Sequence, residues 1–359
     1  MPISRTFVGA GLALTAALAA APASASPAQH TPAAHAAASP AQHASVGQDA
    51  FTFAVIGDVP YGAAARAAFP GQIQQMNEDD LRFVAHVGDI KDGSSECSDA
   101  YFAAVRSALD TFEHPLVYTP GDNEWVDCHR TNNGAYDPLE RLATVREVFF
   151  PVPGKTLGAT MPVRSQAALG LPENVAFRHN RVAFAVVNVQ GSNNSLQPWT
   201  GRGLSEPTTA QLAEVEHRTA AVVEQLRTTF AEARQRHDRA VVVLTQADMF
   251  DPSQLAAAQA DPAAVSGFRA IVAALAEEAN RFDGPVYLVN GDSHAYAADA
   301  PLAAGSPWLG VYGTPAADDL RRVTVDGAAN ATGYLRFTVA PNAAGTDDVL
   351  EWEAVPFAS

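Results

Sequence analysis

The sequence is poor in basic residues and in long apolar runs, and each shortage excludes a class of protein. Its 359 residues include 23 lysines and arginines against 39 aspartates and glutamates, giving a formal net charge of −16. Such a chain lacks the basic groove that binds a nucleic-acid backbone, although a bound metal ion can still recruit a small phosphorylated substrate. The one extended apolar run, from Phe7 to Ala21, is too short to span a membrane comfortably.

Residues 1–49 carry targeting and linker signals. Residues 1–25 have a basic residue near the start, an apolar run and small residues before a cleavage site expected after Ala25, which is the pattern of a secretory signal peptide. A retained N-terminal anchor is the alternative. Residues 26–49 are rich in Ala, Pro, Ser and Gln and are expected to be a disordered linker. Its histidines are either plain linker residues or a weak metal site: His30, His35 and His43.

The protein is therefore expected to be exported, to the periplasm or the extracellular space. Residues 50–359 are expected to form one domain with an ample core. Cysteine is scarce, with Cys97 and Cys128 alone, and in an exported protein such a pair is expected to form one disulfide that joins two loops. Metal ligation by the two thiolates is the alternative, disfavoured because the other candidate ligands are hard oxygens.

Gly-Asp pairs that directly follow apolar, β-branched runs are the most informative feature of the chain. There are four of them, and they end at Asp58, Asp89, Asp122 and Asp292. Because the carboxyl ends of strands in an open α/β sheet share one rim, these carboxylates are expected to meet there. A cluster of hard oxygen ligands is typical of a divalent metal site.

Alternating apolar runs and amphipathic stretches predict an α/β fold. Strands are expected at residues 51–57, 82–88, 116–118, 181–189, 240–245 and 285–290. Helices are expected at residues 63–80 (interrupted at Pro70), 98–111, 138–150 with Asp137 as N-cap, 208–236 and 265–282.

The C-terminal part lacks helix signals. Short strands expected at residues 322–325, 334–339 and 349–355 suggest a second sheet of antiparallel pieces packed on the first. Residues 151–174 hold several Pro and Gly and are expected to cover one edge of the site. The choice of substrate is expected to lie with the irregular segments 128–138, 151–174 and 191–207.

The order of these motifs resembles that of the calcineurin-like metallophosphoesterases. The resemblance is carried by Asp58 after the first strand, by GDIKD and PGDNE after the next two, by the late strand VVLTQ, and by NGDSH near the end. It covers essentially all of the chain from Phe51 to Phe357. It implies a two-sheet α/β/β/α sandwich with a dinuclear metal centre at the strand ends.

Carried over motif by motif, the resemblance assigns Asp89 as the carboxylate that bridges two metals. The remaining ligands that it implies are Asp58, Asp92, Asp122, Gln246, Asp292 and His294. The chain departs from the family where Pro60, Asn123, Gln246 and Asp292 stand at positions that usually hold histidine. Asp92 stands where the purple acid phosphatase branch has a tyrosine, and Asp122 where the family has an asparagine. Because oxygen donors replace imidazoles, the one or two divalent ions are expected to be Mn, Mg or Ca rather than Zn or Fe.

The implied reaction is hydrolysis of phosphate mono- or diesters of a small substrate by attack of metal-bound hydroxide. Asn123 stands at the position of the general acid but cannot donate a proton as an imidazolium does. His129 and Arg130 are candidates to replace it or to bind phosphate, although His129 also fits an ordinary loop residue. His86 is expected to be a hydrogen-bonded core residue, and Tyr61 to pack or to face the substrate.

Two alternatives stay open. The first is a catalytically degenerate metal- or ligand-binding protein on the same fold, because several motif histidines are missing. The second is a serine esterase that uses Gly291-Asp292-Ser293. It is disfavoured because the block follows the last strand of the alternating series rather than the first, and because a G-x-S-x-G elbow is absent.

Overall fold

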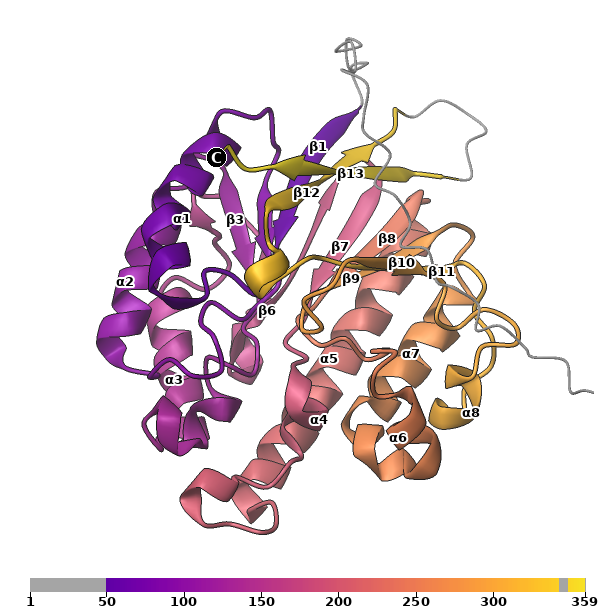
Figure 1. Ribbon diagram of the computed structural model, residues 1–359. Coiled ribbons are helices and arrows are strands. Elements are labelled where there is room, and N and C mark those ends of the chain that lie inside the picture. Colours follow the sequence, from indigo (N-terminus) through magenta and orange to yellow (C-terminus); the bar gives the residue numbers. More distant parts are fainter. Residues whose placement is uncertain (1–49, 342–347, 359) are drawn as a thin grey trace, which may run out of the picture. The chain divides into compact units, whose positions relative to one another are not determined.

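The computed structural model describes residues 50–341 and 348–358, which belong to one compact unit, Ser45–Ser359. The signal peptide and linker expected at residues 1–49, with His30, His35 and His43, lie outside the described residues. Within the described part, the strands form two sheets that face each other, and helices cover both outer faces (Figure 1). The α/β/β/α sandwich expected from the sequence is therefore confirmed. None of the helices in this part of the chain combines the length and the apolar character that a membrane span requires.

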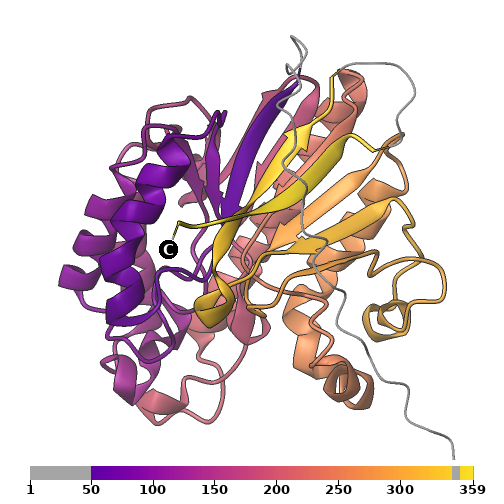
Figure 2. The ribbon, with the colours of Figure 1, turned by 45° about the horizontal axis from the view of Figure 1, so that its top comes forward.

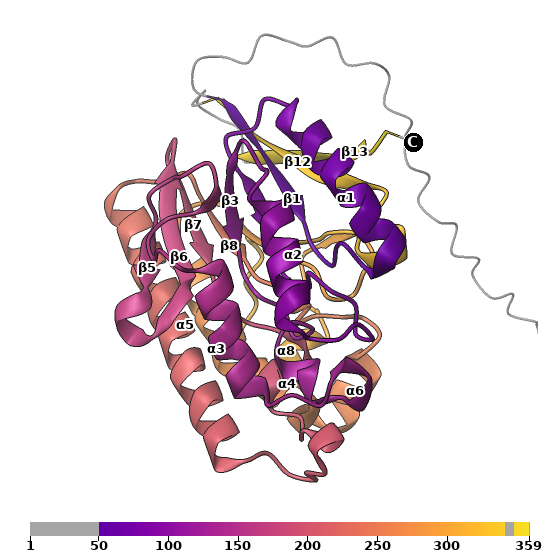
Figure 3. The ribbon, with the colours of Figure 1, turned by 90° about the vertical axis from the view of Figure 1, so that its left-hand side faces the viewer.

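The first sheet contains the strands that precede the first three Gly-Asp loops. In sheet order its strands are β13 (Leu350–Pro356), β12 (Gly333–Val339), β1 (Phe51–Ile56), β2 (Val84–His86), β3 (Pro115–Tyr118) and β4 (Leu157–Gly158). β1, β2 and β3 are parallel, so the loops that follow them leave the sheet at one end. The helices on its outer face are α1 (Gly62–Asn77), α2 (Asp99–Leu109) and α3 (Pro138–Phe149) (Figure 3).

The second sheet contains the strand that precedes the fourth Gly-Asp loop. In sheet order its strands are β10 (Ala297–Asp299), β11 (Leu320–Thr324), β9 (Val286–Asn290), β8 (Ala240–Leu244), β7 (Val182–Val186), β6 (Leu171–His179) and β5 (Arg164–Gln166). Its helices are α4 (Gly191–Ser195), α5 (Thr209–Gln235), α6 (Leu255–Ala260), α7 (Arg269–Ala279) and α8 (Trp308–Tyr312). In Figure 2 the orange helices of this half lie across the sheets from the indigo and magenta helices of the first half.

Short 3-10 helices connect these elements. They are η1 (Val126–His129), η2 (Thr131–Asn133), η3 (Ala167–Leu169), η4 (Thr200–Arg202), η5 (Pro262–Phe268) and η6 (Ala328–Asn330).

A layer of phenylalanines fills the space between the sheets. The ring of Phe53 stacks on Phe83 at 4.8 Å and on Phe337 at 4.9 Å between centroids, and Phe184 of the second sheet meets it edge-on at 5.6 Å. Stacked and edge-to-face pairs of this kind add to the free energy gained by burial. The layer holds the two sheets in register, so that the loops after β1 to β3 and the loop after β9 meet at the same rim.

Helix α1 corrects one expectation from the sequence, because it continues through Pro70. Proline removes one helical hydrogen bond, and its ring crowds the preceding turn. Pro70 lies on the exposed face of the helix, where water can satisfy the carbonyl that loses its partner. The expected interruption is therefore absent from α1.

The C-terminal strands also differ from expectation, because they do not form a sheet of their own. β11 joins the second sheet parallel to β9. In the first sheet, β12 pairs antiparallel with β1, and β13 pairs antiparallel with β12 at the edge of the sheet. These strands complete the open edges that the parallel strands of both sheets would otherwise leave unpaired.

The segment 151–174 lies at sheet edges instead of covering the site. Its first part forms β4, which pairs with the first residues of β3, whereas Asp122 follows the last residue of β3. Its second part forms β5 and the start of β6, the outer strands of the second sheet. Pairing of its backbone with these edges explains why it does not reach across the rim.

Replacing Phe53 with Ala is expected to lower the free energy of unfolding by about 3–5 kcal/mol, because it opens a cavity between the sheets. Phe53→Leu is the matched control and is expected to cost less than about 1.5 kcal/mol. Chemical denaturation followed by circular dichroism measures both values. Equal, small losses for the two variants would show that the aromatic layer does not hold the sheets together.

Candidate metal centre

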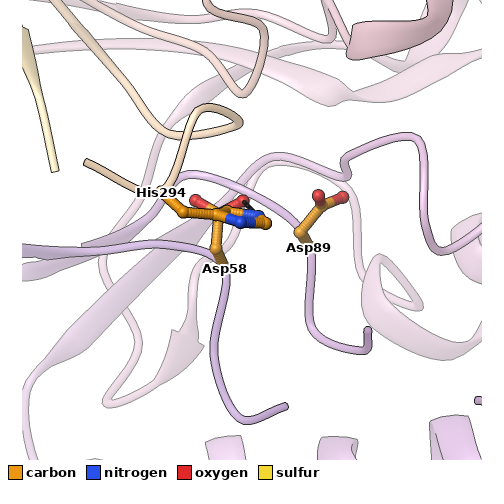
Figure 4. A group of neighbouring side chains, drawn as sticks. All are labelled: Asp58, Asp89 and His294. Carbon is orange, nitrogen blue, oxygen red and sulfur yellow. Dashed lines mark ion pairs between the residues drawn. The ribbon is translucent and has the colours of Figure 1, made fainter. Parts of the chain in front are cut away.

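The four Gly-Asp aspartates meet at one rim, as the sequence predicts. Two groups of side chains place ligand atoms within 4.8 Å of one another. One group contains Asp58, Asp89 and His294 (Figure 4), and the other contains Asp89, Asp122 and Asp292. Asp89 belongs to both groups, which is the arrangement needed for a carboxylate that bridges two metal ions.

The ligand loops have an unusual backbone. Asp58, Asp89, Asp292 and His294 all have positive φ, at 55°, 58°, 75° and 61°. Left-handed conformations are costly for residues with a Cβ, and they cluster at functional sites where the surrounding structure enforces them. Each of these turns directs its side chain into the rim instead of continuing the strand.

Bare glycine backbone packs against the carboxylates, which explains the glycines of the motif. A Cβ on Gly121 would lie 2.0 Å from Asp89 Oδ1, and a Cβ on Gly291 would lie 2.3 Å from Asp58 Oδ2. The glycine of one Gly-Asp pair therefore leaves room for the aspartate of another. Any side chain at these glycines would push the ligand loops apart.

Little positive charge lies close to the carboxylates. Asp58 is 0 % and Asp89 2 % exposed, and no lysine or arginine among the described residues forms an ion pair with the four aspartates. Burial, and then repulsion from Asp122, raises the pKa of Asp89 and of Asp292 well above the usual range, and burial also raises the pKa of Asp122. A divalent cation would offset the negative charge of these carboxylates, so the donor set fits hard divalent ions.

His294 contributes the single imidazole of the two groups. Its Nε2 lies 3.3 Å from Asp58 Oδ1, and this contact raises the pKa of His294. In Figure 4 its ring lies beside the carboxylate of Asp58.

Tyr61 lies in the site although sequence reasoning favoured a packing role. Its hydroxyl donates to Asp89 Oδ2 at 3.1 Å and lies 3.5 Å from Asp58 Oδ1, so it stands between the two carboxylates. Burial, and then the charge of Asp89, raises the pKa of Tyr61. The available signal was its position next to Pro60, where the family motif has a histidine.

Asp92 has a different place from the one expected. Its carboxylate accepts hydrogen bonds from the backbone of Gly62 and Ser94 and from the Ser95 hydroxyl, at 3.1, 2.8 and 2.6 Å, and it lies outside both ligand groups. Burial alone would raise the pKa of Asp92, but these hydrogen bonds outweigh it and lower the pKa to about 2. Asp92 therefore orders the loop after β2.

Gln246 and Asn123 contact the carboxylate of Asp89 through their amide nitrogens. Gln246 Nε2 donates to Asp89 Oδ2 at 3.2 Å, while its oxygen accepts from Gly191 N at 2.7 Å. An amide nitrogen is a donor and not a metal ligand, so in this orientation Gln246 positions Asp89. Asn123 donates from its backbone and its side chain to the two oxygens of Asp89, at 3.1 and 2.9 Å.

His129 and Arg130 have separate environments. The backbone N–H of Gly201 donates to His129 Nδ1 at 3.1 Å, and burial lowers the pKa of this imidazole. His129 lies outside the cavity beside the ligand groups, whereas Arg130 lines that cavity. Arg130 Nη2 also pairs with Asp127 Oδ2 at 2.7 Å.

A buried glutamate and a disulfide stabilise the loops that follow β2 and β3. Glu124 Oε1 accepts hydrogen bonds from Ile90 N at 3.0 Å and from the Tyr118 hydroxyl at 2.9 Å, and burial raises its pKa. This role was not predicted, although Glu124 stands in the PGDNE stretch. The expected disulfide between Cys97 and Cys128 is present and joins the segments after β2 and β3.

His86 matches its expected role as a hydrogen-bonded core residue. Its Nε2 lies 2.9 Å from Val59 O, Gly88 N donates to its Nδ1 at 3.2 Å, and burial lowers its pKa to about 4.

Comparison with known proteins finds similarity in structure but no matching protein family or curated sequence. No protein-family model and no curated protein matches the chain. A dimetal phosphatase from Danio rerio is similar over 86 % of this chain and 99 % of its own, at 11 % identity and a TM-score of 0.45. A purple acid phosphatase from yellow lupin (Lupinus luteus) seeds is similar over 85 % of this chain and 51 % of its own, at 12 % identity and a TM-score of 0.43. At these scores the structural similarity gives no argument about activity, so the description of the site rests on its own geometry.

Gly191→Ala is expected to weaken divalent-metal binding by about 10- to 100-fold, as displaced ligand shells do. Its Cβ would lie 2.6 Å from Asp122 Oδ2 and 2.9 Å from Asp292 Oδ1. Titration calorimetry with Mn²⁺ measures the affinity. Gly310→Ala is the matched control, because a Cβ there meets no atom within 4 Å. Unchanged affinity in Gly191→Ala would show that this pair of carboxylates is not a ligand set.

Metal-free protein is expected to lose stability as the pH rises above about 4, the ordinary pKa of an aspartate. A carboxyl group whose pKa is raised on folding stabilises the fold below its usual pKa, and this contribution is lost as the pH passes its raised value. Added Mn²⁺ should restore the melting temperature most at high pH, where protons compete least.

Asp89→Asn removes a carboxyl group whose pKa is raised well above its usual range and that belongs to both ligand groups, so it should flatten the pH dependence of the melting temperature. Glu206→Gln, in an exposed position, is the control and should keep the wild-type slope. A melting temperature of metal-free wild-type protein that increases as the pH rises above about 4 would contradict the raised pKa of these carboxyl groups.

Proposed function

We propose that the protein is an exported, metal-dependent phosphoesterase that hydrolyses phosphate mono- or diesters of a small substrate. The observation that carries the proposal is the membership of Asp89 in both ligand groups. If each group held a divalent ion, the Asp89 carboxylate would serve both, and such a pair would clamp and polarise a phosphoryl group. Hard oxygen ligands in both groups favour Mn, Mg or Ca over Zn or Fe.

The metal ligands that we propose are drawn from the two groups at the rim: Asp58, Asp89, His294, Asp122 and Asp292. Divalent ions bound there would supply Lewis acidity and charge neutralisation for the ester. Tyr61, Asn123 and Gln246 hold the bridging carboxylate in one orientation through hydrogen bonds to Oδ2. Such outer partners fix ligand geometry and tune the metal.

A cavity of about 280 Å³ next to the second group offers a place for the substrate. Asp292 belongs to both the ligand group and the cavity wall, and Arg130 lines the same wall. We assign Arg130 to binding of the phosphoryl oxygens, for which a guanidinium is well suited. In the reaction, a water oxygen joins phosphorus, the ester P–O bond breaks, and a proton passes to the leaving alcohol.

A metal- or ligand-binding protein without turnover is the second candidate. The observation that favours it is the absence of an imidazole acid from the lining of this cavity, all of which lies in the described part of the chain. Asn123 and the hydrogen-bonded His129 offer no ready proton donor for the leaving group. A leaving group that needs little protonation, such as a nitrophenolate, separates the two candidates.

Export is supported by the disulfide between Cys97 and Cys128, since such bonds persist in oxidising compartments. It agrees with the signal-peptide pattern of the sequence.

We expect chelated protein to regain hydrolysis of p-nitrophenyl phosphate or bis(p-nitrophenyl) phosphate when Mn²⁺, Mg²⁺ or Ca²⁺ is added back. Asp89→Asn should lower kcat/KM at least about 100-fold, because it removes the shared ligand. Glu206→Gln is the surface control. Absorbance of released nitrophenolate gives the rates. Metal binding by wild-type protein without turnover of either ester would favour the second candidate.

A further inference from the structure

The cavity beside the candidate metal centre has an excess of negative charge. Asp248, Asp251 and Asp292 line it, and Arg130 is the basic residue among its lining residues, all of which the structure describes. Neutral amide and hydroxyl side chains supply much of the remaining wall: Ser192, Asn193, Gln197, Gln254 and Ser293. A wall of this composition disfavours an organic group that carries further negative charge.

The charges of the cavity are not equally available to a ligand. Asp248 is buried in an ion pair with Arg322, whereas Arg130 pairs with Asp127 through Nη2 and its side chain stays 43 % exposed, so it can still reach a ligand. Asp292 belongs to a ligand group of the candidate metal centre. Asp251 is the remaining carboxylate, and no lysine, arginine or histidine of the described residues forms an ion pair with it.

Asp251 is held in place while it remains partly exposed. Its Oδ1 accepts from Ser253 N at 2.8 Å, and its Oδ2 accepts from the Ser253 hydroxyl at 2.6 Å. These hydrogen bonds are local, so they fix the carboxylate without neutralising it. An ordered carboxylate without a cationic partner is suited to attract a positive group of a ligand.

Aromatic side chains share the wall with this carboxylate. Phe268 and Trp308 line the cavity, and each is 6 % exposed, so both rings are firmly packed. An aromatic ring attracts an alkylammonium group through its π face and also shields its methyl groups from water. A carboxylate together with packed aromatic rings matches a cationic alkyl group better than a sugar or a second phosphate.

We infer that this cavity receives the organic group of the ester and that this group is an alkylammonium, so that the preferred substrate is an amino-alcohol phosphate. The inference rests on the proposed phosphoesterase function. Arg130 and the candidate metal centre bind the phosphoryl group, and Asp251 with the aromatic wall binds the cationic group. Such a substrate would carry charges of opposite sign on its two groups, matching the guanidinium of Arg130 and the carboxylate of Asp251 among the lining residues.

The test compares three phosphate monoesters that differ in the charge of the organic group. Choline phosphate is cationic, 3,3-dimethylbutyl phosphate is its uncharged carbon isostere, and 3-(phosphonooxy)propanoate is anionic. Release of inorganic phosphate by metal-loaded protein gives kcat/KM for each. We expect the cationic ester to exceed its isostere by about fivefold, as one partly exposed charge pair allows, and the anionic ester to be the poorest. Equal values for the first two would overturn the inference.

Asp251→Asn is the critical variant, because an amide oxygen can still accept from Ser253 N. We expect it to reduce the ratio of the cationic to the uncharged ester towards one. Asp261→Asn is the matched control, since Asp261 caps η5 through Ala263 N but does not line the cavity. An unchanged ratio in Asp251→Asn, or an equal drop in Asp261→Asn, would remove Asp251 from recognition.

The same comparison separates failure of the inference from failure of the proposed function. If the esters are hydrolysed and kcat/KM is equal for the cationic and the uncharged ester, the phosphoesterase function is supported and the preference for a cationic group is rejected. If metal-loaded protein hydrolyses none of them, calorimetry of choline phosphate and its isostere replaces kinetics, and equal Kd values reject the inference.

Two sources of the alkylammonium group are distinguished by a further substrate. Faster hydrolysis of choline phosphate indicates a free amino-alcohol phosphate, whereas faster cleavage of dihexanoyl phosphatidylcholine indicates a lipid headgroup.

Discussion

Repulsion among buried carboxylates is the constraint on which the rest of this structure depends. Asp58, Asp89, Asp122 and Asp292 converge on one rim without a lysine or arginine partner among the described residues. Left to themselves, such groups take up protons or separate. Here bare glycine backbone, left-handed turns and hydrogen bonds from Tyr61 and Asn123 keep them together. The fold therefore keeps the four carboxylates close together at a site where a cation would neutralise them.

The fold explains how the protein tolerates the repulsion among these carboxylates. Three of the aspartates follow parallel strands of one sheet, and the fourth follows a parallel strand of the other. The aromatic layer between the sheets is far from water and makes no use of polar groups, so its burial stabilises the sandwich whatever the charge at the rim. The disulfide between Cys97 and Cys128 joins the segments after β2 and β3, where local repulsion would otherwise open the loops.

The sequence predicted the parts of this account that depend on local pattern. Gly-Asp after a buried strand located the rim, and Asp137 caps α3 as expected. The sequence did not predict the roles of residues whose side-chain direction determines whether they enter the site. The carboxylate of Asp92 accepts hydrogen bonds from Ser94 and Ser95. The spacing of residues within GDIKD does not predict this side-chain orientation. Tyr61 enters the site through a turn, and the tail strands divide between the sheets according to which edges are unpaired.

In the proposed site, Asp89 lies between two divalent ions. Anomalous diffraction from crystals grown with Mn²⁺ tests it most directly. The account predicts two anomalous peaks about 3.5–4 Å apart, one beside Asp58 and His294 and the other beside Asp122 and Asp292, with Asp89 between them. Crystals that contain Mn²⁺ but show no peak at this rim, or show one peak that does not touch Asp89, would contradict it.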